Sequence, residues 1–234
     1  MIFQILLLSD YNIMKHINKE IRIKALLLVI TTITLLLMGS LLYASPLCGE
    51  VANYGPGQYG PFDYTNSGHK KKELRVVESF HFSKDVENLT AGMTGTIGSD
   101  ISYTLNAFPN HHRALSAMSR LSIRDKQSKP TGAKYSALCY FDRAIRFKPG
   151  DAMVRSLYGS HLLELGKLDM ALEQLNVALQ IDPENPTFNY NLGLLYFERK
   201  DYKKAEDFAR KAYSQGFPLL GLKNKLIKAG KWSN

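Results

Sequence analysis

The residues of this chain that are best able to do chemistry are its six histidines. His111 and His112 are adjacent, so on a helix their side chains point in different directions and do not readily share one metal ion. Glu78 and His81 converge only if their segment is helical, and the His-Glu-x-x-His spacing of helical zinc sites does not occur. We therefore predict histidines that cap helices or lie at the surface, and we expect no enzyme activity, no catalytic residue, no metal and no cofactor.

Cys48 and Cys139 are the only two cysteines, and such a pair suggests a disulfide in an oxidising compartment. The bridge would close a loop of 91 residues (139 minus 48), and the chain-entropy account values that loop at about 4 to 5 kcal/mol. The alternative is that Cys139 is a small buried apolar residue and Cys48 an unrelated thiol. The residues leave both possibilities open.

The elements that must position these side chains follow from a repeat in the second half of the chain. Ala137, Ala171 and Ala205 are 34 residues apart, and Gly159 and Gly193 keep the same interval. A repeat of this length with small residues at fixed places is typical of stacked helical hairpins. Such stacks rarely carry chemistry and usually present a surface to another polypeptide.

Apolar spacing predicts helices that pair into hairpins. The expected pairs are 111–123 with 133–147, 152–165 with 168–181, and 186–199 with 202–214. A basic helix over 219–229 is expected to cover the last hairpin, with Leu222, Leu226 and Ile227 as its apolar side. We divide the chain into a start with a secretion segment, an N-terminal module, the repeats (106–149, 152–185 and 186–218), and a capping helix and tail, with boundaries at 1–45, 46–105, 106–216 and 217–234.

The two later units resemble the tetratricopeptide repeat family. Residues 191–196 match the family's leucine–glycine–two residues–tyrosine pattern, and the second helix of that unit matches at Tyr202, Ala205 and Ala212. The middle unit matches at Gly159, Gly166, Leu168, Ala171, Leu175, Ala178 and Pro183, and the first unit only at Ala137, Phe141, Ala144 and Pro149. Over about residues 111–216, the resemblance implies an all-α stack of about three hairpins.

The resemblance also implies a groove that binds a partner, because members of this family typically hold peptides against the first helices of their hairpins. The expected lining is Met153, Ser156, Ser160 and Leu163 in the middle unit and Thr187, Tyr190, Leu194 and Phe197 in the last. The alternative is that several of these side chains pack between hairpins. Within each hairpin, we expect Gly159 to face Ala171 and Gly193 to face Ala205, because a bare Cα lets two backbones approach.

The N-terminal 45 residues look like a secretion segment. Residues 25–44 contain no charge, and Lys15, Lys19, Arg22 and Lys24 precede them. The run is either a signal peptide cut near Ala44 or a membrane anchor, since roughly 20 apolar residues span a bilayer. Met14 is the more natural start, so residues 1–13 are an over-extended start. We expect the remaining chain in the periplasm, or anchored in the inner membrane and facing it.

Residues 46–105 match no pattern that we identify. Glycine and proline interrupt residues 46–72, where aromatic residues argue against a plain disordered linker. We expect an irregular module that packs on the repeats, with a strand or extended arm at 74–82. One hypothesis is that the aromatic run from Tyr54 to Tyr64 fills the groove at Tyr190 and Phe197.

Charge gives the last constraint on the partner. Beyond residue 45 the chain has 26 Lys and Arg against 19 Asp and Glu, a surplus of seven positive charges. Such a surplus favours acidic partners, although nucleic acid is disfavoured by the expected location. We therefore expect a non-catalytic scaffold or assembly factor of the bacterial cell envelope with a protein partner. The alternative is a periplasmic protein that binds a small ligand or metal between the N-terminal module and the repeats.

Overall fold

The computed structural model describes residues 48–51 and 59–233, and every regular element in these ranges is a helix. The elements are α2 (Ser67–His69), the π-helix η2 (Lys70–Leu74), α3 (Arg75–His81), α4 (Lys84–Asn88), α5 (Ile97–Ala107), α6 (His112–Arg124), α7 (Ala137–Phe147), α8 (Ala152–Glu164), α9 (Leu168–Ile181), α10 (Pro186–Glu198), α11 (Tyr202–Ser214) and α12 (Gly221–Lys228). None of these helices has the length and apolar character needed to cross a bilayer. The apolar run 25–44, predicted to be a signal peptide or anchor, lies outside the described residues.

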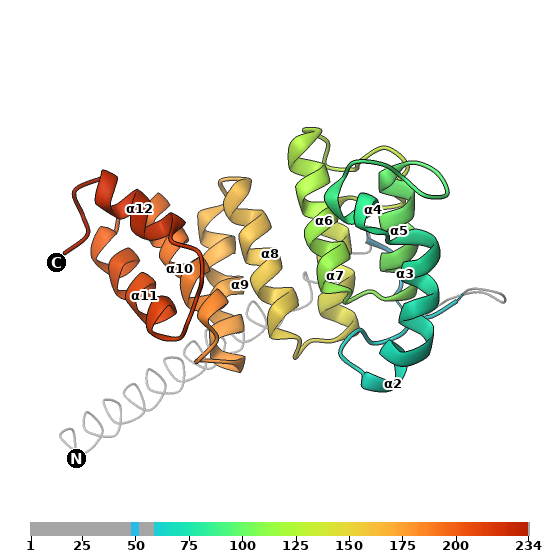
Figure 1. The fold of residues 1–234 in the computed structure, drawn as a ribbon, viewed down its shortest axis with the longest axis horizontal. Helices are drawn as coiled ribbons and strands as arrows, with labels where there is room; N and C mark the ends of the chain where they lie inside the picture. The colour runs from blue at the N-terminus through green and yellow to red at the C-terminus, as the bar shows by residue number, and fades with distance from the viewer. Residues whose placement is uncertain (1–47, 52–58, 234) are drawn as a thin grey trace, which may run out of the picture. The chain divides into compact units, whose positions relative to one another are not determined.

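The repeat region is a row of three helical hairpins, formed by α6 with α7, α8 with α9, and α10 with α11 (Figure 1). Their first helices begin where the sequence supplies caps: the side chains of Asp151 and Asn185 accept backbone N–H groups of the first turns of α8 and α10. Helix α7 begins at Ala137 rather than at 133, because Ser136 caps it after a longer loop. The predicted all-α stack is confirmed for the described residues.

Small residues bring the two helices of each later hairpin together. A Cβ atom on Gly159 would lie 3.3 Å from the Ala171 carbonyl oxygen, and one on Gly193 would lie 3.2 Å from the Ala205 carbonyl oxygen. Both alanines are fully buried. The structure therefore places each glycine against the alanine that the 34-residue interval assigns to it.

The nearest contact of each glycine differs between the two hairpins. At Gly159 the added Cβ would lie 2.6 Å from Cγ of Leu175, which belongs to α9 of the same hairpin. At Gly193 it would lie 2.5 Å from Cδ2 of Leu222, which belongs to α12. The residue of α11 that corresponds to Leu175 is Ala209, 34 positions later. Because Ala209 is small, a leucine from the next helix enters the space.

Residues 74–81 are helical and Phe82 is the C-cap of α3, so the prediction of a strand or extended arm over 74–82 is wrong. Leu74 and Val77 are buried in η2 and α3, whereas Val76 and Phe80 on the same segment are exposed. The buried side chains follow helical spacing, and the exposed apolar pair produced a misleading impression of alternation. Of the module predicted to be irregular, the described residues 59–66 are irregular, and short or longer helices occupy most of the rest.

The aromatic segment (residues 59–66) packs on the N-terminal helices rather than in the groove. The N–H of Phe62 donates to the Ala107 carbonyl at 2.8 Å, and its ring lies 5.3 Å from that of Phe108. The ring of Tyr64 lies 4.3 Å from the imidazole of His111. The hypothesis that Tyr59 to Tyr64 fill the groove at Tyr190 and Phe197 is therefore wrong; Tyr54 lies outside the described residues.

A disulfide joins Cys48 to Cys139 at the start of α7, with 5.0 Å between the two Cα atoms. Two arginines of the same helix hold the segment 48–51. Arg143 donates to the carbonyls of Cys48 and Glu50 at 3.1 and 2.7 Å, and Arg146 donates to the Gly49 carbonyl at 2.8 Å. The N-terminal segment is therefore fastened to the first hairpin by one covalent bond and three hydrogen bonds.

Helix α12 covers the last hairpin, as expected, but with a narrower apolar side. Leu222 and Leu226 are fully buried, whereas Ile227 is 52% exposed. Leu222 and Leu226 are one turn apart, so the residue after Leu226 is rotated by about 100° away from the repeats. The expectation that Ile227 belongs to the buried side is wrong.

Candidate partner-binding groove

The groove predicted from the sequence lies along α8 and α10, and its two serines are committed to contacts inside the protein. Ser156 is buried, and its hydroxyl accepts a hydrogen bond from the Asn191 side chain at 3.0 Å. The Ser160 hydroxyl donates to the Ser156 carbonyl at 3.1 Å. Met153 and Leu163 are half-buried on the same helix. Ser156 therefore links α8 to α10, Ser160 bonds within α8, and both hydroxyls offer little to a partner.

On α10, the predicted lining is largely covered by the C-terminal helix. Tyr190, Leu194 and Phe197 pack against the cluster that contains Leu222 and Leu226. The Tyr190 hydroxyl accepts the N–H of Leu222 at 3.1 Å. Thr187 is half-buried in the first turn, where its N–H donates to the capping side chain of the helix. The last unit therefore uses its aromatic side chains to hold α12.

A cleft of about 610 Å³ remains open beside these contacts, and it brings together two of the eight predicted groove residues, Leu163 and Leu194. Its other lining residues are Glu164, Gly166, Leu168, Glu198 and Lys225. Lys225 of α12 pairs with Glu198 at 3.2 Å. The cleft thus has an apolar floor of three leucines and a charged rim with two carboxylates and one ammonium group.

Only some of the residues that line this cleft could be predicted from the sequence. Glu198 is four residues after Leu194, so both lie on one face of a helix, and this spacing could have identified it. Lys225 could not be found in this way, because it comes from a helix outside the repeats. The binding role of the eight groove residues remains a prediction, and of these residues Leu163 and Leu194 line the cleft.

A smaller cleft of about 300 Å³ lies between α6 and α8. It is lined by Ser122, Ile123, Lys126, Gln127, Ser128, Leu138, His161 and Leu165. His161 is buried, and its Nδ1 lies 2.8 Å from the hydroxyl of Ser119. Burial lowers the pKa of this imidazole to about 4, so the ring is neutral near pH 7. The site is therefore a recess with three apolar side chains, Ile123, Leu138 and Leu165, beside five polar ones, of which His161 is neutral.

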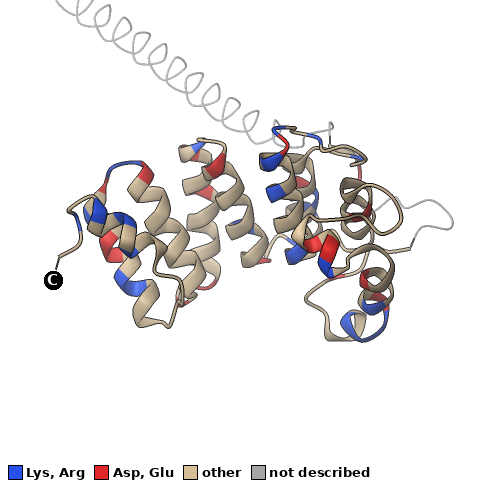
Figure 2. Ribbon diagram, turned by 45° about the horizontal axis from the view of Figure 1, so that its top comes forward, with Lys and Arg blue, Asp and Glu red and all other residues tan. Residues whose placement is uncertain are grey.

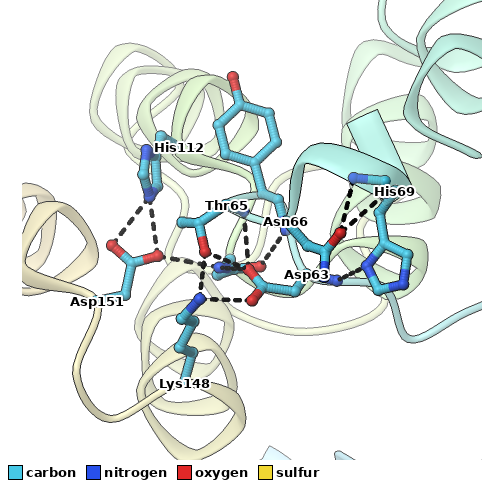
Figure 3. A network of polar contacts seen from close by, with 10 residues as sticks. Asp63, Thr65, Asn66, His69, His112, Lys148 and Asp151 are labelled. Carbon is cyan, nitrogen blue, oxygen red and sulfur yellow. Dashed lines mark hydrogen bonds and ion pairs between the residues drawn. The ribbon is translucent and has the colours of Figure 1, made fainter. Parts of the chain in front are cut away.

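The interface between the N-terminal module and the repeats, where the alternative function places a ligand or metal, is occupied by a polar network (Figure 3). The Asn110 side chain donates to Asp63 at 2.9 Å and to Asp151 at 3.0 Å, and Lys148 pairs with Asp63. His112 contacts Asp151 at 2.9 Å. These side chains satisfy one another and tie the aromatic segment to the first hairpin.

The hydrogen bonds and charges around the two aspartates of this network favour the ionised form of each carboxyl group. Burial acts to raise the pKa of Asp151, but hydrogen bonding and the charge of His112 outweigh it and bring the pKa below its ordinary value. For Asp63 the same competition occurs: burial raises the pKa, and the hydrogen bonds from Lys148 and Asn110 lower it well below its usual range. Both carboxylates are therefore negative near pH 7, and that of Asp63 pairs with the ammonium group of Lys148.

The histidines considered for chemistry are also paired within the chain. Because residues 75–81 form a helix, Glu78 and His81 do lie on one face, but they have different partners. Glu78 lies 3.0 Å from Nε2 of the buried His111, and His81 contacts Asp100 at 3.2 Å. Within residues 48–51 and 59–233, no group of three or more histidine, cysteine, aspartate or glutamate side chains is arranged to hold a metal ion.

The row of hairpins and the small residues inside them define a helical-repeat protein. The sequence matches the family described as TPR repeat over residues 159–200 and the family described as tetratricopeptide repeat over residues 186–215. Residues 159–215 are thus tetratricopeptide repeats. These repeats support a protein–protein interaction scaffold and indicate a protein partner, and the family is typically non-catalytic.

A curated protein is similar to part of this chain. The anaphase-promoting complex subunit CDC16 of Saccharomyces cerevisiae is 27% identical over 81 residues, which cover 35% of this chain and 10% of the yeast protein. The chain therefore spans about a tenth of that relative's length. The similarity supports the repeat architecture, and the activity and partners of the whole yeast protein do not transfer with it.

Proposed function

We propose that this protein is a non-catalytic scaffold or assembly factor of the bacterial cell envelope, which binds a partner polypeptide at the cleft between α8 and α10. The observation that carries the proposal is the cleft of about 610 Å³ with Leu163, Leu168 and Leu194 on its floor. Such a site suits an apolar side chain of an extended peptide. The carboxylates of Glu164 and Glu198 on the rim favour a neighbouring basic group on that peptide.

The envelope part of the proposal has two supports. The Cys48–Cys139 disulfide fits an oxidising compartment, because such bonds are rare in the reducing cytosol. The apolar run 25–44 with its basic flank fits export. Fractionation with a thiol-alkylating reagent tests both: we expect the protein outside the cytosol, with both cysteines unreactive until a reductant is added. Free thiols in a cytosolic fraction would contradict this location.

The partner is tested by crosslinking the full chain in intact cells and isolating it from membranes. We expect one discrete protein to be recovered with the native chain and lost with the double variant Glu164→Lys and Glu198→Lys. These substitutions reverse the charge of the rim at exposed positions and leave the leucine floor in place.

A matched control changes the same charge at exposed positions outside the cleft. Glu173 and Glu184 are exposed and do not line the cleft, so the double variant Glu173→Lys and Glu184→Lys should keep the partner. Equal recovery with both double variants would exclude the cleft as the binding site. Recovery of no protein with the native chain would argue against a scaffold.

A further inference from the structure

The surplus positive charge of this protein is concentrated at one end of the row of helices. Residues 199–233 hold ten Lys and Arg against three Asp and Glu, whereas residues 48–198 hold sixteen of each kind. The whole surplus of seven charges therefore belongs to α11, α12 and the segments beside them. Figure 2 shows these basic positions near the C-terminal end of the repeats. No acidic residue follows Asp207.

Several of the lysines at this end have no carboxylate partner. Lys225 pairs with Glu198, as described above. By contrast, Lys223, Lys228 and Lys231 form no ion pair with any residue that the structure describes. The ammonium group of Lys223 lies 5.2 Å from the ring centre of Trp232, and that of Lys231 lies 5.7 Å from that of Tyr202. Their charge is available to a negative partner outside the chain.

Large apolar side chains are exposed among these lysines. Leu219 is 62% exposed, Leu220 is 53% exposed, and Ile227 is 52% exposed. Leu220 and Ile227 are seven positions apart, so they lie on one stripe of α12 and the residue before it, opposite the buried Leu222. A terminal helix that serves only solubility needs a polar outer face. That role explains the lysines but leaves these three side chains unexplained.

We propose that this cap surface, made of Leu219, Leu220, Lys223, Ile227, Lys228 and Lys231, binds the anionic surface of a lipid bilayer. Apolar side chains of a surface helix enter the boundary between headgroups and acyl chains, while lysines remain at the negative headgroups. The basic residues of the cap surface are all lysines, whose mobile point charges suit a diffuse negative surface. Arg210, beside Trp232, is paired with Glu206. A fixed carboxylate or phosphate of a protein partner would favour the planar fork of arginine.

The chain carries its own probe for this contact. Trp232 is the only tryptophan, and it adjoins Lys231 and the ammonium group of Lys223. Its fluorescence therefore reports on the cap surface even in the full chain, whatever membrane contact residues 25–44 make. The test uses vesicles of phosphatidylcholine alone and vesicles of phosphatidylcholine mixed with phosphatidylglycerol, each with and without brominated acyl chains as a quencher.

We expect brominated lipid to quench Trp232 in the anionic vesicles and not in the neutral ones, and we expect salt to reverse the effect. The double variant Lys228→Gln and Lys231→Gln should raise the lipid concentration for half-quenching by about 25-fold, since each lysine near an anionic surface contributes about fivefold. The double variant Leu220→Ser and Ile227→Ser should retain salt-dependent binding but show weaker quenching.

The matched control removes the same charge from the other end of the protein. Lys71 and Lys72 are exposed on η2, and their replacement by Gln should leave half-quenching within about twofold of the native value. Equal quenching in neutral and anionic vesicles, or the same shift in both lysine double variants, overturns the proposal. A response of Trp232 to polyglutamate with none to anionic vesicles also overturns it and assigns the cap surface to an acidic protein. The result is independent of the cleft between α8 and α10.

Discussion

Removal of the Cys48–Cys139 disulfide should cost this protein a large share of its stability. The bond joins residues 91 positions apart, and the chain-entropy relation gives about 4.6 kcal/mol at 25 °C for a loop of that length. Denatured chains are more compact than the relation assumes, which reduces the effect. We therefore expect the variant Cys48→Ser with Cys139→Ser to lose about 3 to 5 kcal/mol of unfolding free energy.

The hydrogen bonds from Arg143 do not replace the bond. They hold Cys48 and Glu50, but each contributes about 1.5 to 3 kcal/mol only while the segment stays in place. Once the covalent link is absent, the short segment 48–51 must pay its own ordering entropy, about 1 to 2 kcal/mol per residue. Detachment would leave the guanidinium of Arg143 free to reach water.

The assay is equilibrium unfolding in urea of the oxidised native chain, the reduced native chain and the double serine variant. The reduced chain and the variant should agree, and both should unfold at lower urea than the oxidised chain. A difference below about 1 kcal/mol between oxidised chain and variant would refute the loop-closure reasoning. Two reactive thiols in the freshly purified native protein would refute the bond itself.

Two further predictions concern the packing of the cap and the buried imidazole. Ala209→Leu should place a side chain where Leu222 now packs against Gly193, so we expect hydrogen exchange to lose protection over residues 219–231 while α8 and α9 keep theirs; retained protection in the cap would contradict this packing. The pKa of His161 is lowered by burial to about 4 from an ordinary 6.5, so folding favours its neutral form, and the stability that this provides is present above pH 6.5 and lost as the pH falls towards 4. Unfolding free energies measured between pH 7 and pH 4 should therefore fall less in His161→Gln than in the native chain, and parallel curves would exclude His161 as a cause.

The repeats could be predicted in detail because their determinants are local. A cap such as Asp151 or Asn185 acts within its own helix, and the glycine–alanine pairs recur at a fixed interval. Helical periodicity then identified the faces of the hairpins. The strand predicted at 74–82 failed for the opposite reason: Val76 and Phe80 are apolar but exposed, so composition concealed a helical pattern of buried positions.

The occupant of each aromatic surface could not be predicted, because it depends on contacts between distant parts of the chain. Both the rings of α10 and those near His111 are suitable partners for an aromatic segment. In the structure, Tyr190 contacts α12, and the ring of His111 packs against that of Tyr64. The sequence pattern indicates that an aromatic side chain will be buried. Which segment buries it depends on the three-dimensional path of the chain.

Leu175 of the middle repeat corresponds to Ala209 of the last repeat, and this difference limits how many hairpins the row can contain. A further unit duplicated after α11 would have to dock where Leu222 now lies, and it could do so only by evicting α12. The row of hairpins thus ends at α12 because Ala209 lacks one isopropyl group and because Leu222, from outside the repeats, fills the space.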